Sequence, residues 1–259
     1  MSLEIEGIKI KTGRKSKIQL SKFVDSLLYR IVIFYGPPGS GKSTFLCRLA
    51  RILRAYSSRP AKIFWTDPLM MKKKRSLAPW LRKVANADCV FKKYPWEVTY
   101  ELRRLKASDY CAIIIDSVSG MYERVGTQPP RLYQEMKNWM NDVSSRIVDL
   151  IDYGGLLTTI FVLHSTSMFQ GDFYGEKDKP NISWQTVKNV EIVLKGWLEV
   201  HEAKSKREKN YYIKYVFHRT DPWEENYEGM TLTHDDFLGQ TYEDLLKAVG
   251  PPPSKKEGE

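Results

Sequence analysis

The segment GPPGSGKS, residues 36–43, holds the residue types that bind a phosphate chain. It matches the pattern G-x-x-x-x-G-K-[ST] in full. Its glycines let the backbone bend closely around a phosphate, and N–H groups at the start of the following helix attract negative charge. Lys42 would contact the β- and γ-phosphates, and the Ser43 hydroxyl suits Mg²⁺, a hard cation that prefers oxygen ligands. The predicted site for ATP and Mg²⁺ consists of Gly36, Pro37, Pro38, Gly39, Ser40, Gly41, Lys42, Ser43 and Thr44.

Two acidic residues and a histidine end apolar runs, where a parallel sheet gathers its ligands. Asp116 ends AIIID, and we predict that it holds Mg²⁺ through water, although an Asp there also suits a turn cap. Asp67 ends IFWTD and is the candidate for activating the attacking water, although an Asp before a proline also starts turns. His164 is the candidate sensor of the γ-phosphate, with Ser165 or a histidine packed at the core edge as alternatives. The predicted catalytic set is Lys42, Asp67, Asp116 and His164.

The elements that position these residues follow from the apolar pattern. Continuous apolar runs predict buried parallel strands, and the segments between them have helical spacing. Period-two alternation near the end of the chain predicts a hairpin and a last short strand. We expect strands at 31–35, 61–67, 111–117, 156–165, 190–203, 210–219 and 229–235; helices at 19–30, 43–54 and 130–155; mainly helix over 69–110; and a loop over 166–185. This order predicts an α/β fold, with a mostly parallel twisted sheet flanked by helices and antiparallel strands at its C-terminal edge.

The composition suits one domain. The chain has 259 residues with 42% hydrophobic content, which is enough for a sizeable core. We expect a basic N-terminal extension over 1–18, the core domain over 19–248 and a disordered Pro- and Lys-rich tail over 249–259. No apolar run is long enough to span a membrane, and three cysteines without metal spacing suit a reducing compartment. We therefore expect a cytoplasmic protein with no membrane partner.

The formal net charge of +10 indicates an acidic partner. Together with the phosphate motif it favours nucleic acid over an anionic membrane surface. Basic clusters lie at 72–75, 103–106 and 204–209. Each cluster alone also suits a solvated surface, but together they suit salt-dependent binding to a phosphate backbone.

In their order along the chain, GPPGSGKST, IFWTD, AIIIDSVSGMYER, TTIFVLHSTS and the final hairpin resemble the core ATPase domain of the RecA superfamily. The sequence looks most like archaeal RadA paralogues, including RadB, with KaiC-like ATPases nearby. The resemblance covers about residues 19–236. It implies a RecA-like P-loop NTPase fold, Mg-dependent ATP hydrolysis, and a role in homologous recombination or DNA repair.

The resemblance also implies roles for single residues. Lys42 and Ser43 fall on the phosphate and Mg²⁺ positions, and Asp116 falls on the Mg²⁺-associated acid. Asp67 falls where the family usually has a catalytic Glu, and a misplacement of about 1 Å can cost about a hundredfold in rate. We therefore expect slow hydrolysis. His164 falls where recombinases begin an Asn-Gln pair, so the switch that couples ATP to DNA is altered.

Two further regions match the family's contact sites. Residues 168–185 fall on its second DNA-binding loop, and their aromatics and lysines suit stacking on single-stranded bases, or equally a loop folded onto its own protein. The candidate DNA-binding residues are Phe169, Phe173, Tyr174, Lys177, Lys179 and Trp184. His218 and Arg219 fall where a basic residue reaches across a subunit interface towards a neighbour's ATP, with a surface turn as the alternative.

Three functions are open at this point. The first is a slow ATPase, a RadA paralogue that binds DNA, single-stranded for preference, as a homo-oligomer or beside a recombinase. The alternative is a KaiC-like regulatory ATPase that switches protein partners without DNA, which the altered His164 position favours. A small-molecule kinase fits less well, because such enzymes usually carry an Arg-rich lid over the transferred phosphate.

Overall fold

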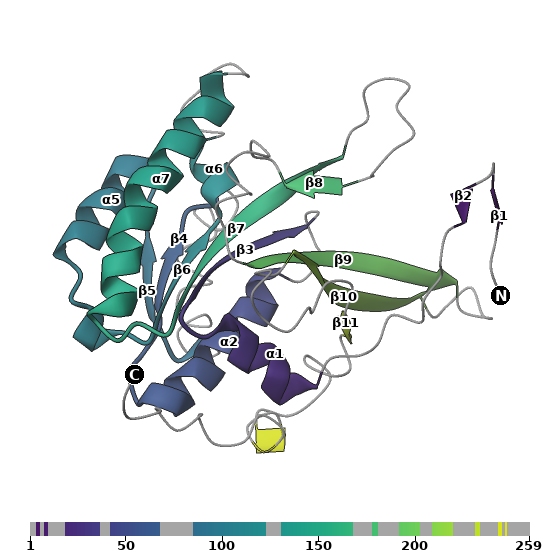
Figure 1. Cartoon of the computed structure of the whole chain (residues 1–259), viewed down its shortest axis with the longest axis horizontal. Coiled ribbons are helices and arrows are strands. Elements are labelled where there is room, and N and C mark those ends of the chain that lie inside the picture. Colours follow the sequence, from purple (N-terminus) through teal and green to yellow (C-terminus); the bar gives the residue numbers. More distant parts are fainter. Residues whose placement is uncertain are drawn as a thin grey trace.

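The protein is an α/β molecule built around one large sheet (Figure 1). The computed structural model describes residues 4–5, 8–9, 19–36, 42–67, 85–122, 131–167, 178–180, 192–202, 209–219, 231–233, 243–244 and 247. Within these residues, nine strands join in the order β11-β10-β9-β3-β7-β6-β4-β5, with β8 pairing to β7 outside this path. The predicted fold class is confirmed.

The centre of the sheet is parallel. Neighbours from β5 through β4, β6, β7 and β3 to β9 all run in the same direction. These strands are β3 (Arg30–Gly36), β4 (Lys62–Trp65), β5 (Asp88–Phe91), β6 (Ala112–Asp116), β7 (Thr158–Ser167) and β9 (Ile192–Glu202). Their carboxyl ends therefore share one edge of the sheet, which is where ligands gather in such folds.

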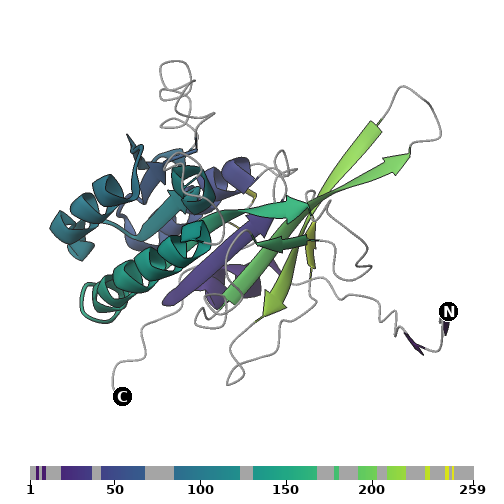
Figure 2. The same ribbon diagram turned by 90° about the horizontal axis from the view of Figure 1, so that it is seen from above.

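Antiparallel strands complete the sheet. They are β8 (Asp178–Pro180), β10 (Lys209–Arg219) and β11 (Thr231–Thr233). The predicted hairpin is present as β9 and β10, and Figure 2 shows it projecting from the rest of the sheet. Its first strand runs parallel to β3, so the antiparallel edge begins one strand later than expected.

Helices cover both faces of the sheet. Figure 1 shows α1 and α2 on one face, and α5, α6 and α7 on the other. Their bounds are α1 (Leu20–Leu27), α2 (Lys42–Ser57), α5 (Pro95–Arg104), α6 (Val118–Tyr122) and α7 (Arg131–Asp152), with a short 3-10 turn at Ala107–Asp109. None of the described helices is long and apolar enough to cross a lipid bilayer.

Side chains of the central strands alternate between two cores. In β3, Val32 and Phe34 pack in the core under α1 and α2. Ile31, Ile33 and Tyr35 pack in the core under α5 and α7. Because both faces are buried, such a strand reads as a continuous apolar run, and the sequence pattern located it for that reason.

Two expectations about local structure need correction. The segment expected to be mainly helical over 69–110 contains strand β5, a four-residue edge strand too short to show a period. The expected loop over 166–185 begins with the last residues of β7, and it contains β8, which pairs back onto β7. Residues of the expected N-terminal extension form a two-stranded pair, β1 (Glu4–Ile5) and β2 (Ile8–Lys9), for which the sequence offered no prediction. The expected disordered tail at 249–259 lies outside the described residues.

Candidate functional site

The predicted catalytic residues converge at the carboxyl edge of the parallel strands. In the register of β3 and β7, Gly36 pairs with His164, so the backbone of His164 lies beside the strand that enters the phosphate motif. In the register of β4 and β6, Trp65 pairs with Asp116, so Asp67 follows at the same edge. The strand registers thus bring the backbones of Gly36, Asp67, Asp116 and His164 to one edge of the sheet.

Lys42 is the first residue of α2 and connects the two ends of the phosphate motif. Its Nζ donates a hydrogen bond to the Gly36 carbonyl oxygen at 2.8 Å. The residue is buried, with 6% of its surface exposed. Residues 37–41 of the motif lie outside the described residues. The N-terminus of a sixteen-residue helix therefore meets the end of a buried strand at this point, which is the arrangement that phosphate binding needs.

The electrostatics of Lys42 favour an anion. Burial lowers the pKa of its ammonium group, while the nearby carboxylates of Asp116 and Asp67 act in the opposite direction. Burial makes the charged form costly, and a bound phosphate would offset part of that cost. The opposing effect of Asp67 also shows that its carboxylate lies within electrostatic range of Lys42.

The Ser43 hydroxyl and the Asp116 carboxylate meet directly. Ser43 Oγ donates a hydrogen bond to Asp116 Oδ2 at 2.7 Å. Asp116 is 3% exposed, and Ser43 is half-buried in the first turn of α2. Hydroxyl and carboxylate oxygens are the ligand types that Mg²⁺ prefers, and carboxylates commonly reach that ion through its waters. The two residues predicted for Mg²⁺ therefore fit that ion.

Buried hydroxyls hold the backbone around Asp116, a feature that the sequence reasoning missed. Thr66 is fully buried, and its Oγ1 donates to the Ser117 carbonyl oxygen at 2.6 Å. Ser117 Oγ in turn accepts a hydrogen bond from the Gly120 N–H at 3.0 Å. The Asp116–Ser117 peptide bond is cis. Thr66 directly precedes Asp67, and Ser117 directly follows Asp116. These positions next to the predicted acids were the sequence signal that could have identified the two hydroxyls.

The structure describes only some of the remaining predicted residues. Thr44 is exposed in the first turn of α2. Lys179 lies in β8, where its backbone pairs with Thr166 of β7. Thr166 is two residues past His164, where the pairing of β7 with β3 ends. The other residues predicted to bind DNA lie outside the described residues; they are Phe169, Phe173, Tyr174, Lys177 and Trp184.

His218 and Arg219 end β10, away from the phosphate motif of their own chain. Arg219 pairs with Val193 of β9, and Val193 pairs with Ile33 in the middle of β3. The ladder is irregular between Phe217 and Arg219. The backbone thus gives Arg219 no approach to the site of its own chain, and contact with a neighbouring subunit stays a prediction.

No protein-family model matches the sequence, and no curated protein matches it. Among solved structures, the chain is similar to a KaiC-like protein from the hyperthermophilic archaeon Pyrococcus horikoshii OT3. The two share 12% sequence identity with a TM-score of 0.51, over 85% of this chain and 98% of that chain. At this identity the likeness shows the fold alone. It supports the KaiC and RecA-like fold and does not single out the RadA paralogues.

Proposed function

We propose that this protein is a Mg²⁺-dependent ATPase of the RecA-like type. The observation that carries the proposal is the hydrogen bond of 2.7 Å between Ser43 of the phosphate motif and Asp116 at the end of β6. These residues are far apart in the sequence, and β7 lies between β3, which leads into the phosphate motif, and β6, which ends at Asp116. A helix that begins with Lys42-Ser43 and is aimed at a buried carboxylate combines a phosphate site with a cation site.

Each side chain has a defined task in this proposal. Lys42 places its charge on the phosphates, while Ser43 and Asp116 would hold Mg²⁺. The ion, when bound, supplies charge stabilisation for the transferred phosphoryl group. Asp67 orients the attacking water and accepts its proton. Asp67 is half-buried at the same edge as Asp116, but its side chain is one methylene shorter than Glu, so hydrolysis is slow.

The finer proposal is that the ATPase binds single-stranded DNA and modulates recombination or repair as a RadA paralogue. The net charge of +10 and the aromatic and lysine residues between 168 and 185 support it. The second candidate is a KaiC-like regulatory ATPase that switches protein partners. The histidine at position 164, where recombinases begin an Asn-Gln pair, favours this candidate.

ATP hydrolysis with and without single-stranded DNA tests both candidates, with Lys42→Ala as the blank. Stimulation by DNA that is lost in Lys42→Ala supports the DNA-linked ATPase. Slow hydrolysis that DNA leaves unchanged supports the regulatory ATPase. Equal phosphate release by the wild type and Lys42→Ala would contradict the proposal that this site hydrolyses ATP.

A further inference from the structure

Helix α5 exposes two large aromatic side chains on one face. Trp96 is 61% exposed and Tyr100 is 57% exposed. They stand four residues apart, so they are neighbours on the helix surface. Most large apolar side chains of the described residues are buried, and the exposed ones are Tyr29, Trp96, Tyr100, Val148 and Tyr153. Two of these share one face of α5, so this face differs from the scattered exposure of an ordinary surface.

The Trp96 ring is already part of a stack. Tyr94 and Trp96 lie face to face, with ring centroids 4.4 Å apart and an angle of 11° between their planes. Lys93 Nζ lies 4.7 Å from the centroid of the Tyr94 ring. Because Tyr94 covers one face of the indole, the exposed surface of Trp96 lies on its other face and its edges. A further flat ring can continue this stack without reorganising it.

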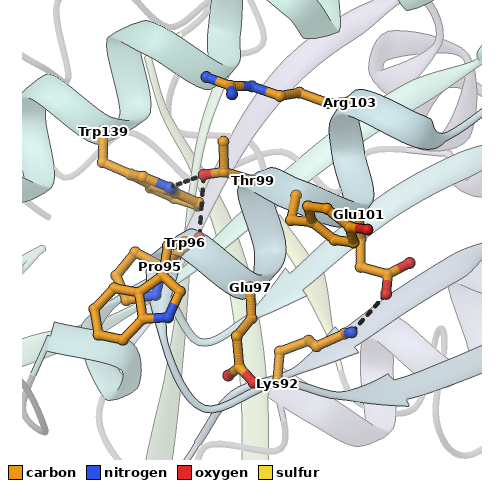
Figure 3. A pocket seen from close by; sticks show the side chains of 9 residues that line it. Lys92, Pro95, Trp96, Glu97, Thr99, Glu101, Arg103 and Trp139 are labelled. Carbon is orange, nitrogen blue, oxygen red and sulfur yellow. Dashed lines mark hydrogen bonds and ion pairs between the residues drawn. The ribbon is translucent and has the colours of Figure 1, made fainter.

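A hollow lies beside this stack, between α5 and α7. Its volume is about 780 Å³, within the range of about 300–1,000 Å³ typical of ligand sites. Figure 3 shows Trp96, Thr99, Arg103 and Trp139 around it. Trp139 Nε1 donates a hydrogen bond to Thr99 Oγ1 at 2.8 Å, which fixes one wall. The side chains of Trp139 and Thr99 are therefore held in place before a ligand binds, which lowers the entropy cost of ordering that wall.

The acidic side chains beside the hollow already have partners within the protein. Glu101 pairs with Lys92, at 2.6 Å between Nζ and Oε1. Glu97 Oε2 accepts the backbone N–H groups of Lys93 and Tyr94, at 2.6 and 2.9 Å, and so caps α5.

Three basic side chains, which do not pair with these two glutamates, lie on α5 or directly before it. The Arg104 guanidinium lies over the Tyr100 ring, 4.9 Å from its centroid, and leaves N–H groups for other partners. Arg103 lines the hollow, and Lys93 Nζ lies over the Tyr94 ring. The face therefore combines stacking surfaces with positive charge, which matches an anionic chain that carries flat rings.

We propose that this aromatic face, formed by Lys93, Tyr94, Trp96, Tyr100, Arg103 and Arg104, binds single-stranded DNA. A base stacks on the open face of Trp96, and neighbouring phosphates contact Arg103 and Arg104. The face is separate in sequence from the phosphate motif and from residues 168–185, so the inference goes beyond the proposed function. The choice of DNA over RNA rests on that function, because stacking does not distinguish the two sugars.

The test is the binding of a fluorescent oligothymidylate of about 15 nucleotides to the full chain, followed by anisotropy. Loss of one stacked base costs about 1–3 kcal/mol, so Trp96→Ala should weaken binding about 5- to 150-fold. Trp96→Phe should retain most of the affinity, because it keeps a ring. Tyr153→Ala is the matched control: Tyr153 is 89% exposed outside this face, and its loss should leave binding unchanged.

A second probe separates stacking from charge. An abasic strand of the same length carries the phosphates without the bases, so its affinity should not depend on Trp96. Arg103→Gln should instead weaken both strands and reduce the slope of log affinity against log salt by about 0.7.

Several outcomes would overturn the proposal. Unchanged oligothymidylate binding in Trp96→Ala would do so, and so would an equal loss on the abasic strand. Tighter binding to oligouridylate or to poly-L-glutamate would assign the face to RNA or to an acidic polypeptide instead. ATP binding is measured on the same samples and should be equal in the wild type and Trp96→Ala. A failure of the ATP site would therefore be visible separately from a failure of this face.

Discussion

Replacing Ser43 with alanine separates the two roles of its hydroxyl, in the fold and in the site. In the protein without nucleotide, Ser43→Ala removes a hydrogen bond of 2.7 Å to a carboxylate that is 3% exposed. A hydrogen bond to a charged group contributes about 1.5–3 kcal/mol, so the free energy of unfolding should fall by about that amount. Ser43→Thr retains the hydroxyl, so its free energy of unfolding should stay close to that of the wild type.

The same variants report on Mg²⁺. A ligand present at about 100 times its dissociation constant raises the free energy of unfolding by about 2.7 kcal/mol. If loss of the hydroxyl weakens MgATP binding about tenfold, the same ATP concentration raises the free energy of unfolding by only about 1.4 kcal/mol. This gain in stability is called the MgATP increment below. Urea unfolding of the wild type, Ser43→Ala and Ser43→Thr, each with EDTA, with ATP and EDTA, and with MgATP, measures both quantities.

A full MgATP increment in the stability of Ser43→Ala would contradict the assignment of Ser43 as a Mg²⁺ ligand. That result would mean that the hydroxyl serves only to hold Asp116, and that the cation site lies elsewhere. Equal stabilisation of the wild type by MgATP and by ATP with EDTA would also contradict that assignment, because the nucleotide would then bind without the metal. A loss of stability without nucleotide in Ser43→Thr would show that the fold rejects the added methyl group.

Four other substitutions test separate parts of the structure. Asp67→Glu should raise the rate of phosphate release by about 10- to 100-fold, because it restores the reach of a longer acid; an unchanged rate with normal ATP binding would remove Asp67 from the mechanism. Arg219→Ala should lower hydrolysis about 100-fold while ATP binding is retained, and unchanged turnover would argue against a contact across subunits. Gly154→Ala would place a Cβ 2.0 Å from the Ala107 Cβ, so it should destabilise the fold by about 1–3 kcal/mol, and Ala107→Gly in the same chain should recover part of the loss. Gly155→Ala has room for its Cβ but a φ of +69°, so it should cost about 1 kcal/mol that Ala107→Gly does not recover.

Local chemistry was readable from the sequence wherever neighbouring residues act together. The phosphate motif is contiguous, and α2 begins at Lys42 within it, so the position of the helix N-terminus follows from the motif itself. The strands β3, β4, β6 and β7 were readable because parallel strands are buried on both faces, which forces continuous apolar runs. Short strands at an edge lack that constraint, and for that reason β5 and β8 were not predicted.

The sequence by itself therefore determined the phosphate motif, the central strands and the acids at their ends. Only the tertiary structure decided the contact between Ser43 and Asp116, because it depends on the order of strands in the sheet and not on spacing along the chain. It also decided the parallel direction of β9 and the exposure of Trp96 and Tyr100. An apolar pattern predicts burial, but which face of a helix is covered depends on the segment that packs against it, and that partner is distant in the sequence.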